Sequence, residues 1–206
     1  AQAKWEKTLK GDNWTVTAGL SHRTAQEEKF DGQRILEVGG KVAQYNYNSA
    51  FTFAVWIRPE TKNAAILSRG EDQFEGQGHF LHLAEGKLRL HVIYRWSDLG
   101  MRLETEEPVR LNEWSHVLVA YDGNMRAAGV RVYVNGVPQK FKVMLDQCMW
   151  PMDTKEPFRI GAGGGQRFTG AIRDVRVYDR ALTEAEVGAV EVLHRDGLAG
   201  EGLAVE

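Results

Sequence analysis

The stretch Phe51–Pro59, which reads FTFAVWIRP, decides the fold. Large apolar side chains stand at every second position of this run, with Thr52, Ala54 and Trp56 between them, and Pro59 ends it. Successive side chains of a β-strand point to opposite faces, so this alternation predicts a strand with one apolar and one mixed face.

Similar runs follow along the chain. Residues 117–121 alternate up to Asp122-Gly123, and residues 130–134 alternate up to Asn135-Gly136. An Asn-Gly pair after an apolar run is typical of a tight hairpin, because a type I′ turn needs positive φ at both central positions. Further strands are predicted at residues 158–161 and 171–178. Many of the 22 glycines of the chain are expected to lie in the turns between strands.

One helix is expected near the C-terminal end. Thr183 and Glu186 have the spacing of a capping box, and Val187 and Val190 continue as an apolar stripe. Residues 197–206 are rich in Gly and Ala and are predicted to form a tail or linker. The pattern predicts one all-β domain over residues 1–206, with a core at about residues 28–188 and one short C-terminal helix.

Two hairpins bear on function. Residues 81–84 are expected to pair with residues 87–96 around Glu85-Gly86, and Trp96 then faces Met101 across a second turn, with Tyr94 opposite Leu103. The core face of this register holds Leu81, Leu83, Leu88, Leu90, Val92, Leu103 and Tyr94, and the opposite face holds Phe80, His82, Arg89, His91, Ile93, Arg95, Arg102 and Glu104. A slip of one residue would exchange the two sets.

Several segments resemble, in order, the LamG-like, concanavalin A-type lectin/glucanase superfamily. They are FDG at 30–32, FTFAVWIRP at 51–59, NEWSHVLVAYDG at 112–123, VRVYVNG at 130–136, RIG at 159–161 and FTGAIRDVRVYDRALTEAEV at 168–187. The resemblance implies two curved antiparallel sheets in a jelly-roll sandwich, in agreement with the alternation. It also implies ligand binding, often to carbohydrate and sometimes with a bound calcium ion.

A narrower resemblance joins YRW at 94–96, MRL at 101–103 and DGNMRAAG at 122–129. These segments are similar to LamG-like domains of large bacterial envelope proteins with cytochrome-c-like domains, which implies an exported, multidomain parent protein. For calcium, the resemblance carries over only Asp31 and Asp174, because Arg173-Asp174 stands where many relatives have Asp-Glu. The alternative is an Asx turn at Asp31 and an arginine partner for Asp174.

Charge and cysteine content exclude other classes. The formal net charge is −2 and no basic block occurs, so we expect no nucleic-acid partner. No apolar stretch approaches the roughly 20 residues of a membrane helix, so we expect no membrane insertion. Cys148 is the only cysteine and is expected to be a small, partly buried apolar side chain.

Catalytic patterns are missing. The Glu-x-Asp-x-x-Glu pattern of catalytic relatives is absent, and the nearest imitation is Glu104 and Glu106 just before Pro108. Arg95 and Arg102 are expected to keep Glu104 ionised, which does not suit an acid catalyst. The six histidines have no metalloprotease spacing, and no G-x-S-x-G elbow occurs.

Binding is the function that remains. The predicted ligand-binding residues are Phe80, His82, Arg89, His91, Arg95, Trp96, Arg102 and Glu104, with Trp96 or Trp150 at the rim of a shallow groove. The alternative is a hydrated outer sheet with cross-strand charge pairs. Tyr45 and Tyr47 are further candidates as exposed aromatic residues, whereas Trp56 and Trp114 are expected to pack.

The sequence thus predicts a non-catalytic, carbohydrate-binding module of an exported bacterial protein. The alternatives are a protein-interaction or spacer domain that docks on neighbouring domains of its parent and, with less support, a glycoside hydrolase.

Overall fold

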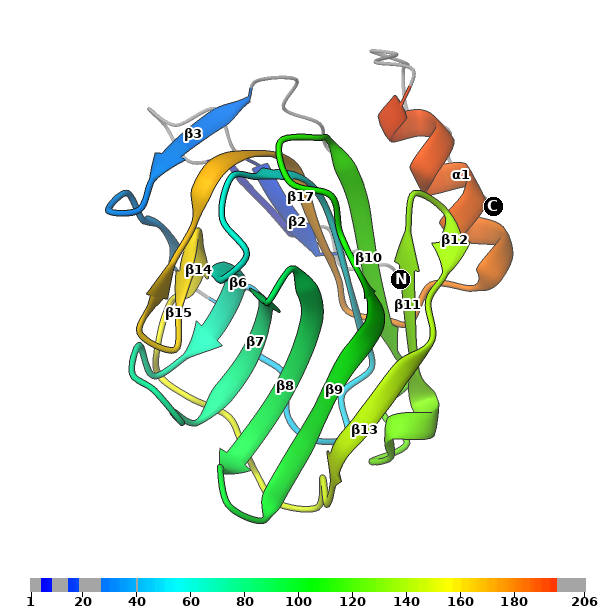
Figure 1. Cartoon of the computed structure of the whole chain (residues 1–206). Coiled ribbons are helices and arrows are strands. Elements are labelled where there is room, and N and C mark those ends of the chain that lie inside the picture. Colours follow the sequence, from blue (N-terminus) through cyan, green and yellow to red (C-terminus); the bar gives the residue numbers. More distant parts are fainter. Residues whose placement is uncertain (1–4, 9–14, 19–26, 40, 196–206) are drawn as a thin grey trace.

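Two large β-sheets pack face to face in the computed structural model, which describes residues 5–8, 15–18, 27–39 and 41–195 (Figure 1). The eight-stranded sheet has the order β1-β2-β17-β5-β10-β11-β12, with β3 beside β17. Its strands are β1 (Trp5–Thr8), β2 (Thr15–Ala18), β3 (Glu28–Asp31), β5 (Phe51–Pro59), β10 (Ser115–Tyr121), β11 (Val130–Val134), β12 (Val137–Pro138) and β17 (Thr169–Tyr178).

The second sheet has seven strands in the order β13-β9-β8-β7-β6-β14-β4. These are β4 (Leu36–Val38), β6 (Ala64–Gly70), β7 (Gly78–Ala84), β8 (Lys87–Arg95), β9 (Leu99–Pro108), β13 (Phe141–Asp146) and β14 (Phe158–Ile160). A small hairpin of β15 (Ala162–Gly163) and β16 (Gln166–Arg167), a short 3₁₀ turn η1 (Ala127–Gly129) and the helix α1 (Glu184–Arg195) complete the described elements. The predicted all-β jelly-roll sandwich with one short helix is confirmed.

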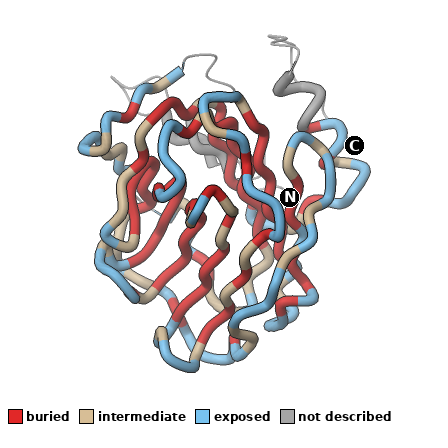
Figure 2. The backbone as a smooth tube through the Cα atoms, in the orientation of Figure 1, coloured by how far each residue is buried: buried red, intermediate tan, exposed pale blue. Residues whose placement is uncertain are grey.

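The core lies between the inner faces of the two sheets, where the buried segments converge (Figure 2). Phe51 is fully buried and stacks on Tyr45, with ring centroids 4.9 Å apart. The ring centroids of Phe53 and Tyr121 lie 4.8 Å and 5.5 Å from that of Phe51. Each fully buried large apolar side chain contributes about 1.5–3 kcal/mol, so this aromatic cluster is a major source of stability.

The second face of β5 is also buried, although the sequence predicted a mixed one. Ala54 packs under the side chains of Leu182 and Val187, in a smaller cluster beneath the start of α1. The Thr52 hydroxyl donates to the Arg180 carbonyl at 2.8 Å and accepts from the Leu182 amide at 2.9 Å. The segment before the helix therefore covers this part of the outer face of the sheet.

The predicted helix cap is confirmed. The Thr183 amide donates to the Glu186 carboxylate at 2.8 Å, and the Glu186 amide donates to the Thr183 hydroxyl at 3.4 Å. This reciprocal pair satisfies two amides at the first turn.

The hairpin from β7 to β8 has the predicted register, with Leu83 opposite Leu88 and Leu81 opposite Leu90. Glu85 and Gly86 turn the chain with φ of 50° and 79°, as a type I′ turn requires.

The register from β8 to β9 differs from the prediction by four residues. Met101 pairs with Val92 instead of Trp96, and Leu103 pairs with Leu90 instead of Tyr94. An irregularity after Ile93 tightens the turn, so β9 begins earlier than expected. A shift by an even number preserves the faces of β9, but it leaves Tyr94 exposed instead of in the core.

The predicted tail at residues 197–206 lies outside the residues that the structure describes. Within the described part, no helix is long and apolar enough to cross a membrane.

Candidate functional site

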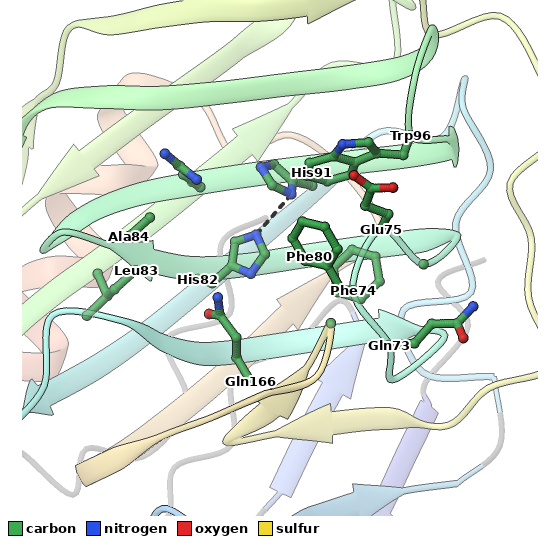
Figure 3. A pocket seen from close by; sticks show the side chains of 13 residues that line it. Gln73, Phe74, Glu75, Phe80, His82, Leu83, Ala84, His91, Trp96 and Gln166 are labelled. Atoms are coloured by element: carbon green, nitrogen blue, oxygen red, sulfur yellow. Dashed lines mark hydrogen bonds between the residues drawn. The ribbon is translucent and has the colours of Figure 1, made fainter.

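A groove lies on the outer face of the seven-stranded sheet, over β7 and β8 (Figure 3). Phe80 and His82 rise from β7, and Arg89 and His91 rise from β8. The groove is completed by the loop between β6 and β7, the β15–β16 hairpin and the end of β8, which contribute Gln73, Phe74, Glu75, Gly76, Gly164, Gln166 and Trp96. Its cavity volume is about 60 Å³. Pockets that enclose a drug-sized ligand start at roughly 300 Å³, so this groove fits only part of a ligand.

The sheet register brings the strand residues of the groove together. His82 is opposite Arg89 and Phe80 is opposite His91, so the four side chains share one face. The predicted alternation therefore holds at this place. The two halves of this face differ: Phe80 and His91 are each only 3% exposed, whereas Arg89 and Glu104 form a partly exposed cross-strand charge pair of the kind that the alternative expects.

The β15–β16 hairpin covers this face because a glycine allows it to approach closely. Gly163 has a φ of 154°, and a Cβ there would lie 2.5 Å from the Ser68 hydroxyl and 3.3 Å from the Phe80 ring. The same hydroxyl donates to the Ala162 carbonyl at 2.7 Å. The glycine-rich stretch at residues 161–165 thus supplies one wall of the groove.

Two histidines form the floor of the groove. His82 Nε2 and His91 Nδ1 are 3.0 Å apart and share one hydrogen bond, whose donor depends on the tautomer. The other nitrogens, His82 Nδ1 and His91 Nε2, are buried and have no hydrogen-bond partner. Burial lowers the pKa of His82 to about 4, with a contribution from Arg89. Burial, helped by His82, Arg89 and Arg102, lowers the pKa of His91 to about 2, so both rings are neutral at pH 7.

Aromatic side chains form the far wall. The Trp96 ring meets the His91 ring edge-on at 5.2 Å, and Phe74 lies 5.7 Å from Trp96. Phe74 is 75% exposed, which is unusual for so large an apolar side chain. The guanidinium of Arg102 lies 4.3 Å from the centre of the Trp96 ring and outside the groove lining.

Glu104 is held by a different arginine than predicted. Arg89 donates to Glu104 from Nε and from a terminal nitrogen, each at 2.6 Å, and Lys87 is 4.0 Å away. The expected partners Arg95 and Arg102 do not contact Glu104. The carboxylate is therefore engaged in an ion pair at the edge of the groove.

Arg95, which the sequence predicted as a ligand-binding residue, does not line the groove. It is the exposed last residue of β8, paired with Leu99 after the irregularity that follows Ile93, and it donates twice to Asp98 at 2.6 and 2.7 Å.

Other aromatic candidates also lie elsewhere. Tyr45 is 4% exposed and is part of the core, so its prediction as an exposed residue is wrong. Tyr47 is partly buried and packs against the core. Trp150, the other candidate for the rim, stacks on Tyr94 at 6.1 Å and does not line the groove.

The two predicted calcium ligands do not come together. Asp31 pairs with Thr169 across the sheet, and Asp174 lies five residues further along β17, roughly 16 Å away at strand spacing. Asp31 accepts the amides of Gln33 and Arg34 at 2.9 Å, an Asx turn that lowers its pKa. The Asp174 carboxylate accepts from Arg176 Nε at 3.1 Å.

This arrangement does not fit a calcium ion shared by the two aspartates, which needs six to eight oxygen ligands. Among the described side chains, no group of three or more His, Cys, Asp or Glu residues is placed to hold a metal.

The sequence missed the residues that the two loops contribute. Phe74 carried one signal, a lone aromatic side chain in the polar stretch of residues 71–78. Gln166 and Gly164 carried none, because their place at the groove depends on a hairpin folding over a strand that lies more than 70 residues earlier. Gln166 Oε1 is buried without a hydrogen-bond partner, like the two histidine nitrogens.

Comparison with known proteins identifies the family. Residues 30–188 match the Laminin_G_3 family, described as the Concanavalin A-like lectin/glucanases superfamily. The match covers more than half of the chain, so the protein belongs to this family. Its two large packed β-sheets agree with this membership.

Individual relatives are distant. The chain is 23% identical over 150 residues to the adhesion G-protein coupled receptor V1 of Danio rerio, a match over 66% of this chain and 2% of the receptor. The chain thus spans a very small part of that relative.

Two solved structures with bound sugars share the fold. The CBM40 of a Ruminococcus gnavus IT-sialidase, bound to α2,3-sialyllactose, has 16% identity and a TM-score of 0.55, with 81% of this chain and 98% of that chain covered. The ligand-binding domain of botulinum neurotoxin serotype D, in complex with N-acetylneuraminic acid, has 14% identity and a TM-score of 0.60, with 92% and 46% covered. At such identities the likeness establishes the fold alone.

Proposed function

We propose that this chain is a non-catalytic carbohydrate-binding module and that the groove over β7 and β8 holds the sugar. The observation that carries the proposal is the floor of the groove, where three buried polar atoms lack partners beside an aromatic wall. An unsatisfied buried polar atom costs about 1–3 kcal/mol, and a ligand that hydrogen-bonds to it recovers part of that cost. Aromatic faces beside polar groups are what a sugar ring requires, because it has apolar C–H faces and polar edges.

The solved relatives with bound glycans support carbohydrate as the ligand class at the level of the fold. Family membership supports an extracellular or periplasmic location, and we propose that the domain belongs to a larger exported bacterial protein. We propose further that binding at the groove does not depend on calcium, because Asp31 and Asp174 are far apart and both already have partners.

A glycan array and affinity gels loaded with polysaccharides test the proposal, each run with and without EDTA. We expect retention by at least one glycan class in both conditions. The Trp96→Ala variant is expected to lose most of this retention, because stacking of the sugar ring on the indole is lost. Trp150→Ala is the matched control, since Trp150 is an exposed tryptophan outside the groove.

Retention that is equal in wild type and Trp96→Ala would place the site elsewhere, and no retention on any glycan would refute carbohydrate binding. Hydrolysis of a retained glycan would refute the non-catalytic assignment and revive the glycoside hydrolase.

A protein-interaction module is the second candidate, and one observation favours it. The edge strand β13 exposes Val143 and Met144, and the segment after it exposes Met149 and Trp150, each with 42–51% of its surface. Exposed apolar side chains on neighbouring segments are typical of a docking surface. The test is binding of this domain to adjoining domains of the parent protein. If Met144→Asp abolishes that binding and Trp96→Ala leaves it intact, the result favours this candidate over the glycan module.

A further inference from the structure

We infer that the His82–His91 pair selects the ligand of the groove, and that this ligand is an uncharged sugar that presents two neighbouring hydroxyls. The inference rests on the proposed carbohydrate-binding function and names the class of sugar.

The first step concerns the shared hydrogen bond. The rings are neutral, so each has one N–H donor and one acceptor nitrogen. If His82 Nε2 donates to His91 Nδ1, then His82 Nδ1 is left as an acceptor and His91 Nε2 as a donor. If the shared proton sits on His91 instead, the two outer roles are exchanged. In either state the pair presents one free donor and one free acceptor.

The second step concerns the ligand groups that match this pair. A hydroxyl both donates and accepts, so two hydroxyls satisfy the outer nitrogens in either tautomeric state. A carboxylate or sulfate only accepts, so it satisfies one nitrogen and leaves the other unpaired. Gln166 Oε1, a further acceptor without a partner, also requires a donor from the ligand.

The third step concerns charge. Arg89 and Glu75 are the charged side chains among the described residues that line the groove. The Arg89 charge is balanced by Glu104 at 2.6 Å. Glu75 is exposed and repels an anion, and the guanidinium of Arg102 lies against the Trp96 ring outside the lining. Among the described residues of the lining, the one cation is therefore compensated, and desolvating a carboxylate against this lining is costly.

The fourth step concerns access. His82 Nδ1, His91 Nε2 and Gln166 Oε1 are all covered in this structure. Trp96 stands edge-on to the His91 ring and is partly exposed in the turn after β8, and Gln166 reaches toward His82 (Figure 3). A hydroxyl reaches the pair once these two side chains turn aside, and the indole then stands beside the sugar.

The experiment uses the protein labelled with ¹⁵N-histidine and the neutral glycan that the array identifies. The free protein is expected to show imidazole ¹⁵N signals of neutral rings for His82 and His91, averaged between two tautomers. Saturation with the neutral glycan is expected to shift both sets of signals, because His82 Nδ1 and His91 Nε2 gain hydrogen-bond partners, while the His116 signals stay unchanged. His116 is the control, because it is buried on the other sheet.

Affinity measurements then test the class of sugar. The neutral glycan is expected to bind at least ten-fold more tightly than a counterpart in which a uronic or sialic acid replaces the terminal sugar. Periodate treatment, which cleaves neighbouring hydroxyls, is expected to abolish binding. His82→Leu is expected to lose about ten-fold in affinity, and His82→Gln, which retains a donor and an acceptor, is expected to regain part of it.

The outcomes separate the two levels of the proposal. Tighter binding of the acidic glycan would overturn the inference and leave the proposed function standing. The same holds if the His82 and His91 signals stay unchanged at saturation by a glycan whose binding requires Trp96. The absence of binding to every glycan would overturn both. The NMR and periodate measurements use the wild-type protein, so they decide the inference even if a histidine variant fails to fold.

Discussion

Acid is expected to destabilise this protein through its buried histidines, and His79 provides the sharpest case. The His79 ring is 1% exposed and has the edges of the Tyr45 and Phe51 rings around it, each with a centroid distance of 5.9 Å. Burial, with a smaller contribution from Arg69, lowers the pKa of His79 to about 4 from its ordinary 6.5. The proton therefore binds the unfolded chain more readily than the folded protein.

The sign and size follow from this difference. The stabilisation by neutral His79 is complete above pH 6.5 and is lost as the pH falls from 6.5 toward 4. One such group changes the free energy of unfolding by about 1.4 kcal/mol per pH unit, which amounts to about 2 kcal/mol at pH 5. His82, His91 and His116 have lowered pKa values as well and act in the same direction. Domains are stable by only about 5–15 kcal/mol, so a loss of this direction and size is a substantial fraction of the total.

Urea unfolding at several pH values between 7.5 and 5 measures the effect. The free energy of unfolding is expected to fall with pH in the wild type, and to fall less steeply in His79→Leu, by about 1.4 kcal/mol per pH unit. The comparison of slopes remains valid even though the variant has a different stability at pH 7. Equal slopes in the two proteins, or a wild-type stability that does not change between pH 6.5 and 5, would refute the reasoning.

Three further predictions concern the sandwich and its helix. Thr52→Val keeps the shape but leaves the Arg180 carbonyl and the Leu182 amide without their partner, so we expect a loss of about 2–4 kcal/mol in urea unfolding, with little loss in Thr52→Ser. Phe51→Ala opens a cavity in the aromatic cluster and is expected to cost about 3–5 kcal/mol; a loss below 1 kcal/mol in thermal unfolding would mean that the cluster is not central to the core. Glu186→Ala removes the capping carboxylate that also pairs with Arg180, and we expect the free energy of unfolding to fall by about 1 kcal/mol. An unchanged free energy of unfolding would contradict this role of the cap.

The elements with local signals were predicted well. The strand at Phe51–Pro59 has the predicted bounds, because alternation ended by a proline depends only on neighbouring residues. The turn at Glu85-Gly86 and the cap at Thr183 were also predicted, since each is set by backbone geometry within a few residues.

The turn from β8 to β9 shows where local reasoning fails. Nothing in residues 93–99 specifies the irregularity after Ile93, because the tight turn is chosen by the pairing of both strands along their whole length. The predicted register was wrong by four residues. Arg102 and Glu104 still point outward as predicted, whereas Arg95 does not line the groove and Tyr94 is exposed instead of buried in the core.

Strand periodicity and turn residues are local features of the sequence, and they predicted the sandwich, the helix cap, the β7–β8 register and the shared face of Phe80, His82, Arg89 and His91. Whether that face is covered and hollowed depends instead on the assembled fold. The loop that carries Phe74 and the hairpin that carries Gln166 come from distant parts of the chain, and their closure over β7 buries two imidazoles whose outer nitrogens lack partners. Burial is a property of the assembled sheets, and no alternation of residues encodes which outer face another segment covers.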